Sequence, residues 1–84
     1  MNLEQLQAHA RIIQAMQDKT PFVIDWDDFN QAKYYIDCST ITGNYIIDVR
    51  YKYQAIGAIY GSYEACQFII DNHKKDLDIL RGAL

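Results

Sequence analysis

The sequence is poor in proline, glycine and cysteine, and it contains no long apolar run. There are one proline, four glycines and two cysteines in 84 residues. No stretch reaches the roughly 18 apolar residues that a membrane-spanning helix needs. Residues 1–19 are also too polar for a signal peptide. We therefore expect a cytoplasmic protein with no membrane partner.

The two cysteines, Cys38 and Cys66, form no C-x-x-C pair and so give no metal-binding or redox motif. Thiols of cytosolic proteins are normally reduced. We expect two free, partly buried thiols, since a disulfide would need suitable Cβ geometry and an oxidising compartment.

Basic residues are scarce as well. Eight Lys and Arg against eleven Asp and Glu give a net charge of −3. Proteins that bind nucleic acids need a basic face to neutralise phosphates. Nucleic acid is therefore disfavoured as a partner, and −3 is also far short of the charge that a DNA mimic carries.

The length predicts one domain over residues 1–84, and the helix and strand patterns described below make its expected fold class α+β. A chain of this size buries only about 60–65% of its unfolded surface. Its net stability is then small, and dimerisation is a natural supplement. With half of its residues apolar and 23% charged, the composition is that of an ordinary globular protein.

Residues 2–18 are predicted to form a helix that ends at Thr20, because Pro21 disfavours the α conformation of its predecessor. Apolar residues recur at spacings of three and four, which puts them on one face. We expect this face, widened by Ile12, to point to the core. Its members are Leu3, Leu6, Ala10, Ile13 and Met16.

The middle of the chain alternates between apolar and polar residues, the pattern of antiparallel strands with one wet face. Strands are predicted over 33–39, 45–54 and 58–60, with a turn at 42–44 between the first two. They would form a three-stranded meander, with a fourth strand at 22–26 as the alternative. The alternation places Tyr45, Tyr51 and Tyr53 on the covered face.

A closing helix is predicted after Ser62, a suitable N-cap, with Glu64 favourably placed in its first turn. Asn72 is expected to end it, and a short C-terminal helix follows. The N-terminal and closing helices would cover one face of the sheet. The expected inward residues are Ala65, Cys66, Phe68 and Ile69 in the closing helix and Leu77, Ile79 and Leu80 in the last one.

The segments DWDDFNQAKYYI (25–36) and YKYQAIGAIYGSYEA (51–65) resemble a group of small proteins from phages and prophages of Gram-positive bacteria. Shared features are a K-Y-Y-I strand and a G-x-I-Y strand that leads into an acidic-capped helix. Gly61 departs from the pattern, since a bulky aromatic is more usual there. The resemblance covers about two-thirds of the chain and implies accessory phage biology, such as counter-defence or regulation of host machinery. It implies no particular activity.

No constellation of catalytic residues stands out. The cluster Asp25, Asp27 and Asp28 lacks the ligand spacing and the glycine of a calcium loop. Neither His9 nor His73 is accompanied by a nucleophile elbow. The segment GAIYG lacks the Gly-Lys-Ser/Thr of a phosphate loop. We therefore expect no enzymatic activity, no metal and no cofactor.

Two sets of residues are candidates for protein contact. One lies on the open face of the predicted sheet; the other lies in an acidic turn, where exposed aromatic side chains rimmed by charge are typical of hot spots. The alternative for the turn is a lid over the end of the core. The open-face set is Tyr35, Ile46, Arg50 and Lys52, and the turn set is Trp26, Asp27, Asp28 and Phe29.

The favoured function is a small protein-binding protein that blocks a host or defence-system complex sterically in the bacterial cytoplasm, for example an anti-CRISPR protein. One alternative is a nucleic-acid-binding module that uses Tyr35, Arg50 and Lys52 on the open sheet face. Another is a structural homodimer that pairs through an edge strand or the Ile46 face.

Overall fold

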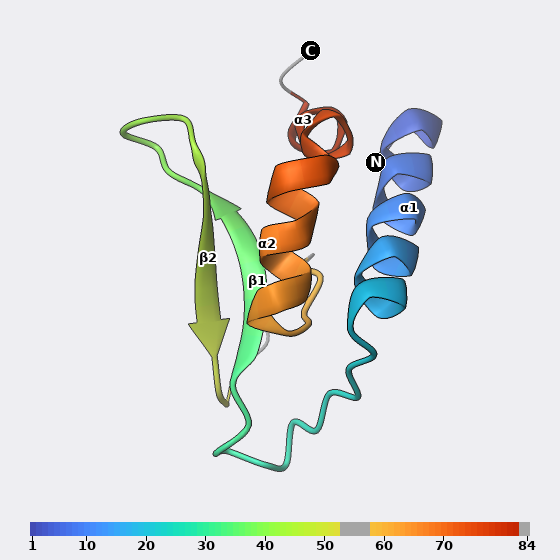
Figure 1. Cartoon of the computed structure of the whole chain (residues 1–84). Coiled ribbons are helices and arrows are strands. Elements are labelled where there is room, and N and C mark those ends of the chain that lie inside the picture. The colour runs from blue at the N-terminus through green and yellow to red at the C-terminus, as the bar shows by residue number, and fades with distance from the viewer. Residues whose placement is uncertain (53–57, 83–84) are drawn as a thin grey trace.

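The computed structural model describes residues 1–52 and 58–82, and its architecture is α+β (Figure 1). An N-terminal helix is followed by a two-stranded hairpin and two C-terminal helices. The elements are α1 (Leu3–Lys19), β1 (Lys33–Cys38), β2 (Tyr45–Arg50), α2 (Tyr63–Asn72) and α3 (Lys74–Arg81). The predicted fold class and N-terminal helix are confirmed, whereas the described residues contain two strands rather than three.

Helix α1 begins with a capping box. The Asn2 side chain accepts a hydrogen bond from the Gln5 amide, and the Gln5 side chain accepts one from the Asn2 amide. Two amide groups that have no partner within the helix are thereby satisfied. Thr20, the residue before Pro21, is the C-cap, as the sequence predicts.

The expected core face of α1 is confirmed at Ile12 and Met16 but wrong for the rest of the stripe. The residues that α1 buries are Ala8, Ile12 and Met16. Most of the predicted stripe lies on the surface instead: Leu3 is 70% exposed, Leu6 50% and Ile13 40%. The buried face contains Ala8 and the half-buried Ala15, and such small side chains let α1 pack closely on α2 and α3.

Strands β1 and β2 form an antiparallel hairpin, with Lys33 opposite Arg50 and Cys38 opposite Tyr45. In the connecting turn the Ser39 amide donates to the Asn44 carbonyl at 2.8 Å. Gly43 has φ of +75°, a left-handed conformation that glycine adopts without strain. The predicted turn residues therefore do form the turn.

The predicted third strand is not formed. Residues 58–60 are irregular, and a single bridge joins Gly61 to Tyr34, with hydrogen bonds of 3.0 and 2.8 Å. This bridge lies on β1 rather than β2, so the order is not that of a meander. The chain turns into α2 directly after Gly61, because Ser62 accepts the Ala65 amide as its N-cap.

Two other strand predictions are not confirmed in full, since one strand is absent and the other is shorter than expected. Residues 22–26 form no strand. Strand β2 stops at Arg50, so Tyr51 follows no alternation and is 46% exposed, contrary to the expectation of a covered position. Tyr53 and Gln54, predicted as the end of that strand, lie outside the described residues.

The core lies between the sheet, α2 and the two other helices. Helix α2 stands between the hairpin and α1, while α3 packs against α1 near the C-terminal end of the chain (Figure 1). Side chains from β1 and β2, including Ile36, Ile47 and Tyr45, pack against this core from the sheet side. The buried cluster consists of Ile12, Met16, Ala65, Cys66, Ile69 and Leu77.

Candidate protein-contact surface

The sheet face turned away from α2 is covered at Lys33 and Tyr35, whereas Asp37, Ile46, Asp48 and Arg50 on the same face are exposed. On this face Lys33 is 0% exposed and Tyr35 is 6% exposed. Their neighbours there are Trp26, from the turn before β1, and Tyr60, from the segment before α2. The expectation that Tyr35 lies open on a bare sheet face is therefore wrong.

Lys33 is the centre of this arrangement. Its ammonium group donates hydrogen bonds to the carbonyl oxygens of Asp28 at 2.9 Å, Gln31 at 3.0 Å and Tyr51 at 3.1 Å. These carbonyls satisfy all three donors of a buried charge, which would otherwise be costly. Lys33 thus joins the turn before β1 to the chain that leaves β2.

Aromatic rings surround the same lysine. Nζ of Lys33 is 5.1 Å from the centroid of the Trp26 ring, within the range of a cation–π interaction. Trp26 meets Tyr60 edge to face at 5.1 Å, and Tyr60 lies 5.3 Å from Tyr35. Trp26 is half-buried, so the interpretation of this residue as a lid fits its contacts.

The two candidate sets that the sequence keeps apart meet at this cluster. Arg50 of β2 lies 5.7 Å above the Tyr35 ring, and Lys52 lies 5.3 Å above the Phe29 ring. Phe29 remains 56% exposed, and both cations are exposed. Ile46 is 44% exposed but stands four residues before Arg50, about 13 Å along the strand.

We call Phe29, Ile46, Arg50 and Lys52 the sheet contact surface. Its phenylalanine and arginine are of the types that are enriched at protein interfaces. The cation–π contacts hold Phe29 and Arg50 against the folded protein before any partner binds, which lowers the entropy cost of ordering them on association.

The acidic residues of the turn cap their own backbone. The Asp25 carboxylate accepts the Asp27 amide at 3.0 Å, and the Asp28 carboxylate accepts the Asn30 amide at 3.0 Å. These are the Asx turns that such residues commonly form. Asp27 and Asp28 are exposed next to Phe29, so they line one side of the sheet contact surface.

A second polar cluster ties α3 to the hairpin. The Tyr45 hydroxyl donates to Asp78, and burial together with this bond raises the pKa of Tyr45. The same bond, with a further one from Lys74, lowers the pKa of Asp78. Arg81 contacts the sulfur of Cys38 at 2.6 Å. These contacts fix the end of α3 and leave Cys38 half-buried beside a guanidinium.

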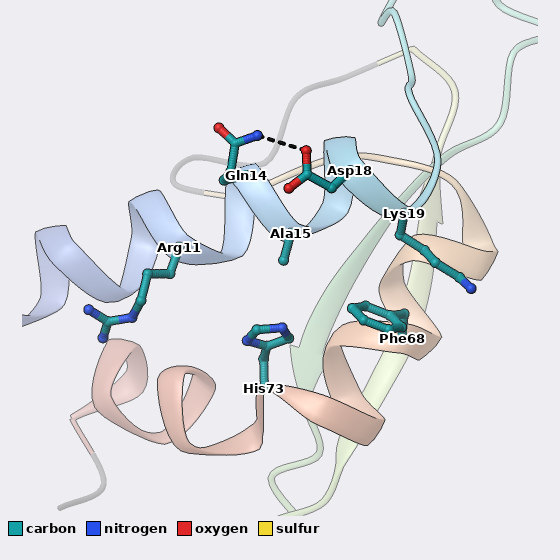
Figure 2. A pocket seen from close by; sticks show the side chains of 7 residues that line it. All are labelled: Arg11, Gln14, Ala15, Asp18, Lys19, Phe68 and His73. Carbon is teal, nitrogen blue, oxygen red and sulfur yellow. Dashed lines mark hydrogen bonds between the residues drawn. The ribbon is translucent and has the colours of Figure 1, made fainter.

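An open groove of about 550 Å³ lies between α1 and the α2–α3 corner (Figure 2). Phe68 and Ala15 are among its apolar lining residues. Arg11 forms an ion pair with Asp76 at 2.7 Å and thereby lowers the pKa of that carboxyl group. Lys19 lies over the Phe68 ring at 5.3 Å. Arg11 and Lys19 of the groove are thus held by Asp76 and Phe68.

Within 1–52 and 58–82, no group of three or more His, Cys, Asp and Glu is placed to hold an ion. No helix in those ranges is long and apolar enough to cross a membrane.

No protein-family model, curated protein or solved structure matches this chain. The resemblance to small phage proteins therefore stays a prediction.

Sequence reasoning found all four members of the sheet contact surface but missed the buried Lys33 and Tyr60 that lie beside it. Lysine is almost never fully buried, and a short run of alternating residues does not reveal which face a distant turn covers. The spacing between Trp26 and Lys33 gives no signal of their contact, because the intervening turn folds back in space.

Proposed function

We propose that this chain is a small protein-binding protein without enzymatic activity, and that it acts on a bacterial host or defence complex by covering part of its surface. The observation that carries the proposal is the sheet contact surface, where Phe29 is 56% exposed and is held by Lys52, beside Arg50. Exposed, preordered aromatic and arginine side chains are the usual anchors of protein interfaces.

The inhibitory role rests on the sequence resemblance. A chain of 84 residues can block a larger complex sterically if one rigid patch binds tightly. The clamp of Lys33 on three carbonyls supplies that rigidity, because it joins the Phe29 turn to the chain after β2. Inhibition of a CRISPR complex is the concrete form that we propose.

The nucleic-acid alternative has less support. It needs Tyr35 as a platform on which bases stack, and Tyr35 is 6% exposed beneath Arg50 and Tyr60. Arg50 and Lys52 are exposed, but both lie over aromatic rings. We therefore do not propose nucleic acid as the partner.

A comparative pull-down tests the surface. The wild type, Phe29→Ala, Arg50→Ala and the control Lys75→Ala serve as baits in lysate of a Gram-positive bacterium. Lys75 is an exposed lysine on α3, away from the sheet contact surface. We expect a partner that the wild type and the control retain, and whose affinity falls about 10- to 100-fold for the other two, the usual range for hot-spot truncations.

The inhibitory form is tested in cells. Expression of the chain in a strain with active CRISPR immunity should restore plaque formation by a targeted phage, and Phe29→Ala should weaken this effect. A partner that every bait retains equally would contradict the proposed surface. A measured enzymatic turnover, with no specific partner recovered, would contradict the proposed function itself.

A further inference from the structure

Strand β2 is the outer edge of the sheet (Figure 1). Its far side has no strand partner among residues 1–52 and 58–82. Successive residues of an antiparallel strand direct their backbone groups to opposite sides. The Asn44 carbonyl accepts a hydrogen bond from the Ser39 amide, so the even-numbered residues of β2 bond to β1 and the odd-numbered ones point to the open edge. These odd-numbered residues are Tyr45, Ile47 and Val49.

This open edge is protected at one end only. The Val49 amide donates to the Asp48 carboxylate at 2.7 Å. Among the described residues, no hydrogen bond engages the amides of Tyr45 and Ile47 or the carbonyls of all three odd-numbered residues. Strand β2 also contains neither proline nor lysine, the residues that commonly block such an edge. Amides and carbonyls in this alternating row match one kind of occupant, an extended strand.

We propose that the partner presents an extended segment, which adds to the open edge of β2 as a further antiparallel strand. This inference rests on the proposed function and deepens it, because two members of the sheet contact surface belong to β2. Ile46 and Arg50 lie roughly 13 Å apart along the strand, so a single segment laid along the edge contacts both. Main-chain hydrogen bonds would supply affinity and the neighbouring side chains specificity.

The open edge places these two side chains where they meet the segment closely. On this side of β2, Ile46 and Arg50 would belong to pairs that exchange no hydrogen bonds, in which the Cα atoms are only about 4.5 Å apart. Side chains of the segment opposite them therefore come into direct contact. On the other face the odd-numbered residues of β2 are half-buried, and β-branched apolar residues suit the positions opposite them.

The charges along the edge determine the chemistry of the segment. Arg50 and Lys52 are exposed, and neither forms an ion pair within the described part of the chain. Asp48 already accepts hydrogen bonds from the Tyr35 hydroxyl and from a backbone amide. We therefore expect an acid opposite Arg50, a neutral residue opposite Asp48 and an apolar residue opposite Ile46. In the antiparallel direction the acid comes first and the apolar residue four positions later.

A second copy of this chain is a poorer occupant. An antiparallel pair of β2 strands puts an acid opposite Arg50 only when it is centred on Val49. That register needs Tyr51 of one copy opposite Ile47 of the other. Strand β2 ends before Tyr51, however, and Lys33 donates to the Tyr51 carbonyl. The charges of the edge therefore favour a segment of another protein.

A synthetic peptide tests the edge directly. Fluorescein-labelled EVTVIT sets its glutamate opposite Arg50 and its isoleucine opposite Ile46. We expect binding in fluorescence polarisation with a dissociation constant on the order of 100 µM, the range of a weak complex. Arg50→Glu should weaken it about 5-fold, because a repulsive cross-strand pair replaces an attractive one, and should instead favour the peptide KVTVIT. The control Lys75→Glu makes the same change in net charge on α3 and should bind EVTVIT like the wild type.

Methylation of single peptide amides separates strand addition from other modes of contact. The fourth residue of the peptide faces Ile47 and must donate its amide to β2, so its N-methylation should weaken binding about 10-fold or more. The third residue faces Asp48, and its amide points away from β2. N-methylation there should change the affinity by less than about 3-fold. Both peptides carry the same added group and leave the protein unaltered.

Hydrogen exchange at single amides, followed by NMR, locates the added strand. A saturating peptide should slow the exchange of the Tyr45 and Ile47 amides, whereas the Ile46 and Asp48 amides are already bonded to β1 and should change little. The same measurement on the partner from the pull-down separates the two proposals. A partner that depends on Arg50 but leaves the Tyr45 and Ile47 amides unprotected would overturn the strand addition and leave the proposed function standing.

Failure of the peptide to bind at about 1 mM protein would overturn the proposal. So would equal weakening by the two N-methylations, or an unchanged affinity of Arg50→Glu for EVTVIT. Protection of the Tyr45 and Ile47 amides that rises with protein concentration alone would also overturn it, because a second copy would then occupy the edge. Circular dichroism confirms that Arg50→Glu keeps its helices. Should this variant fail to fold, Arg50→Gln replaces it, and the methylated peptides decide with the wild type.

Discussion

Replacement of Lys33 by methionine removes the ammonium group that joins the turn before β1 to the chain after β2. Methionine keeps most of the side-chain volume and the apolar stem. Three carbonyl oxygens, of Asp28, Gln31 and Tyr51, then lose their donor. The Trp26 ring also loses the cation 5.1 Å from its centroid.

The magnitude follows from these contacts. A hydrogen bond to a charged group contributes about 1.5–3 kcal/mol, and an unsatisfied buried group costs about 1–3 kcal/mol. Asp28 and Tyr51 are exposed residues, so water can reach part of the released backbone. We therefore expect a loss of about 2–4 kcal/mol in the free energy of unfolding. For 84 residues the total is about 4–13 kcal/mol, so this change is a large share.

Urea denaturation followed by tryptophan fluorescence measures the loss, because Trp26 is the only tryptophan in the chain. A loss of this size corresponds to a fall in melting temperature of about 10–25 °C for a protein of this length. The control is Lys75→Met on the exposed side of α3, which should change the stability by less than about 0.5 kcal/mol.

A second readout follows the turn itself. If Lys33 holds Trp26 against Tyr60, acrylamide should quench the fluorescence of Lys33→Met more strongly than that of the wild type in native buffer. Equal unfolding midpoints for Lys33→Met and Lys75→Met, together with unchanged quenching, would refute the idea that the buried ammonium stabilises this surface.

Three further predictions concern single groups. In native buffer at pH 8, a thiol reagent should modify Cys38 but not Cys66, because full burial raises the pKa of the Cys66 thiol to about 11. The variant Cys38→Ser should then show no fast-reacting thiol. In urea, both thiols of the wild type should react. Gly61→Ala places a Cβ 2.6 Å from the terminal methyl of Met16. Because that methyl is the end of a flexible side chain that can turn aside, we expect a loss below the roughly 1–3 kcal/mol that is usual for overpacking in urea denaturation. A loss at the upper end of that range would contradict this reasoning. The hydrogen bond from the Arg11 guanidinium lowers the pKa of Asp76. The ionised carboxylate therefore stabilises the fold above the ordinary carboxyl pKa, and this stabilisation is lost as the pH falls through the lowered pKa of the folded protein. Asp76→Asn should be less stable than the wild type at pH 6, and the difference in stability should shrink below pH 4. A difference that stays constant with pH would rule out the ion pair as its source.

Local sequence determined the parts of the fold that depend on neighbouring residues. The hairpin forms where alternation and a turn glycine, Gly43, coincide. Helix α1 ends at Lys19, with Thr20 as its C-cap before a proline, and α2 begins at Tyr63 after the N-cap Ser62, whose hydroxyl accepts the Ala65 amide. Each feature needs only contacts within a few residues, and such contacts can be inferred from a single sequence.

Tertiary contacts decided which surfaces are buried. Helix α1 offers two apolar faces, and the one with the small residues Ala8 and Ala15 packs on α2 and α3, although the Leu3–Ile13 stripe is the more regular pattern. Lys33 is buried because carbonyls from two separate segments converge on its ammonium group. The sequence by itself therefore determined the helices, the hairpin and the core-facing side of that hairpin. Long-range packing decided that Gly61 forms a single bridge to β1 instead of residues 58–60 forming a strand, and which face of α1 is covered, since both depend on the shape and hydrogen-bonding groups of distant segments.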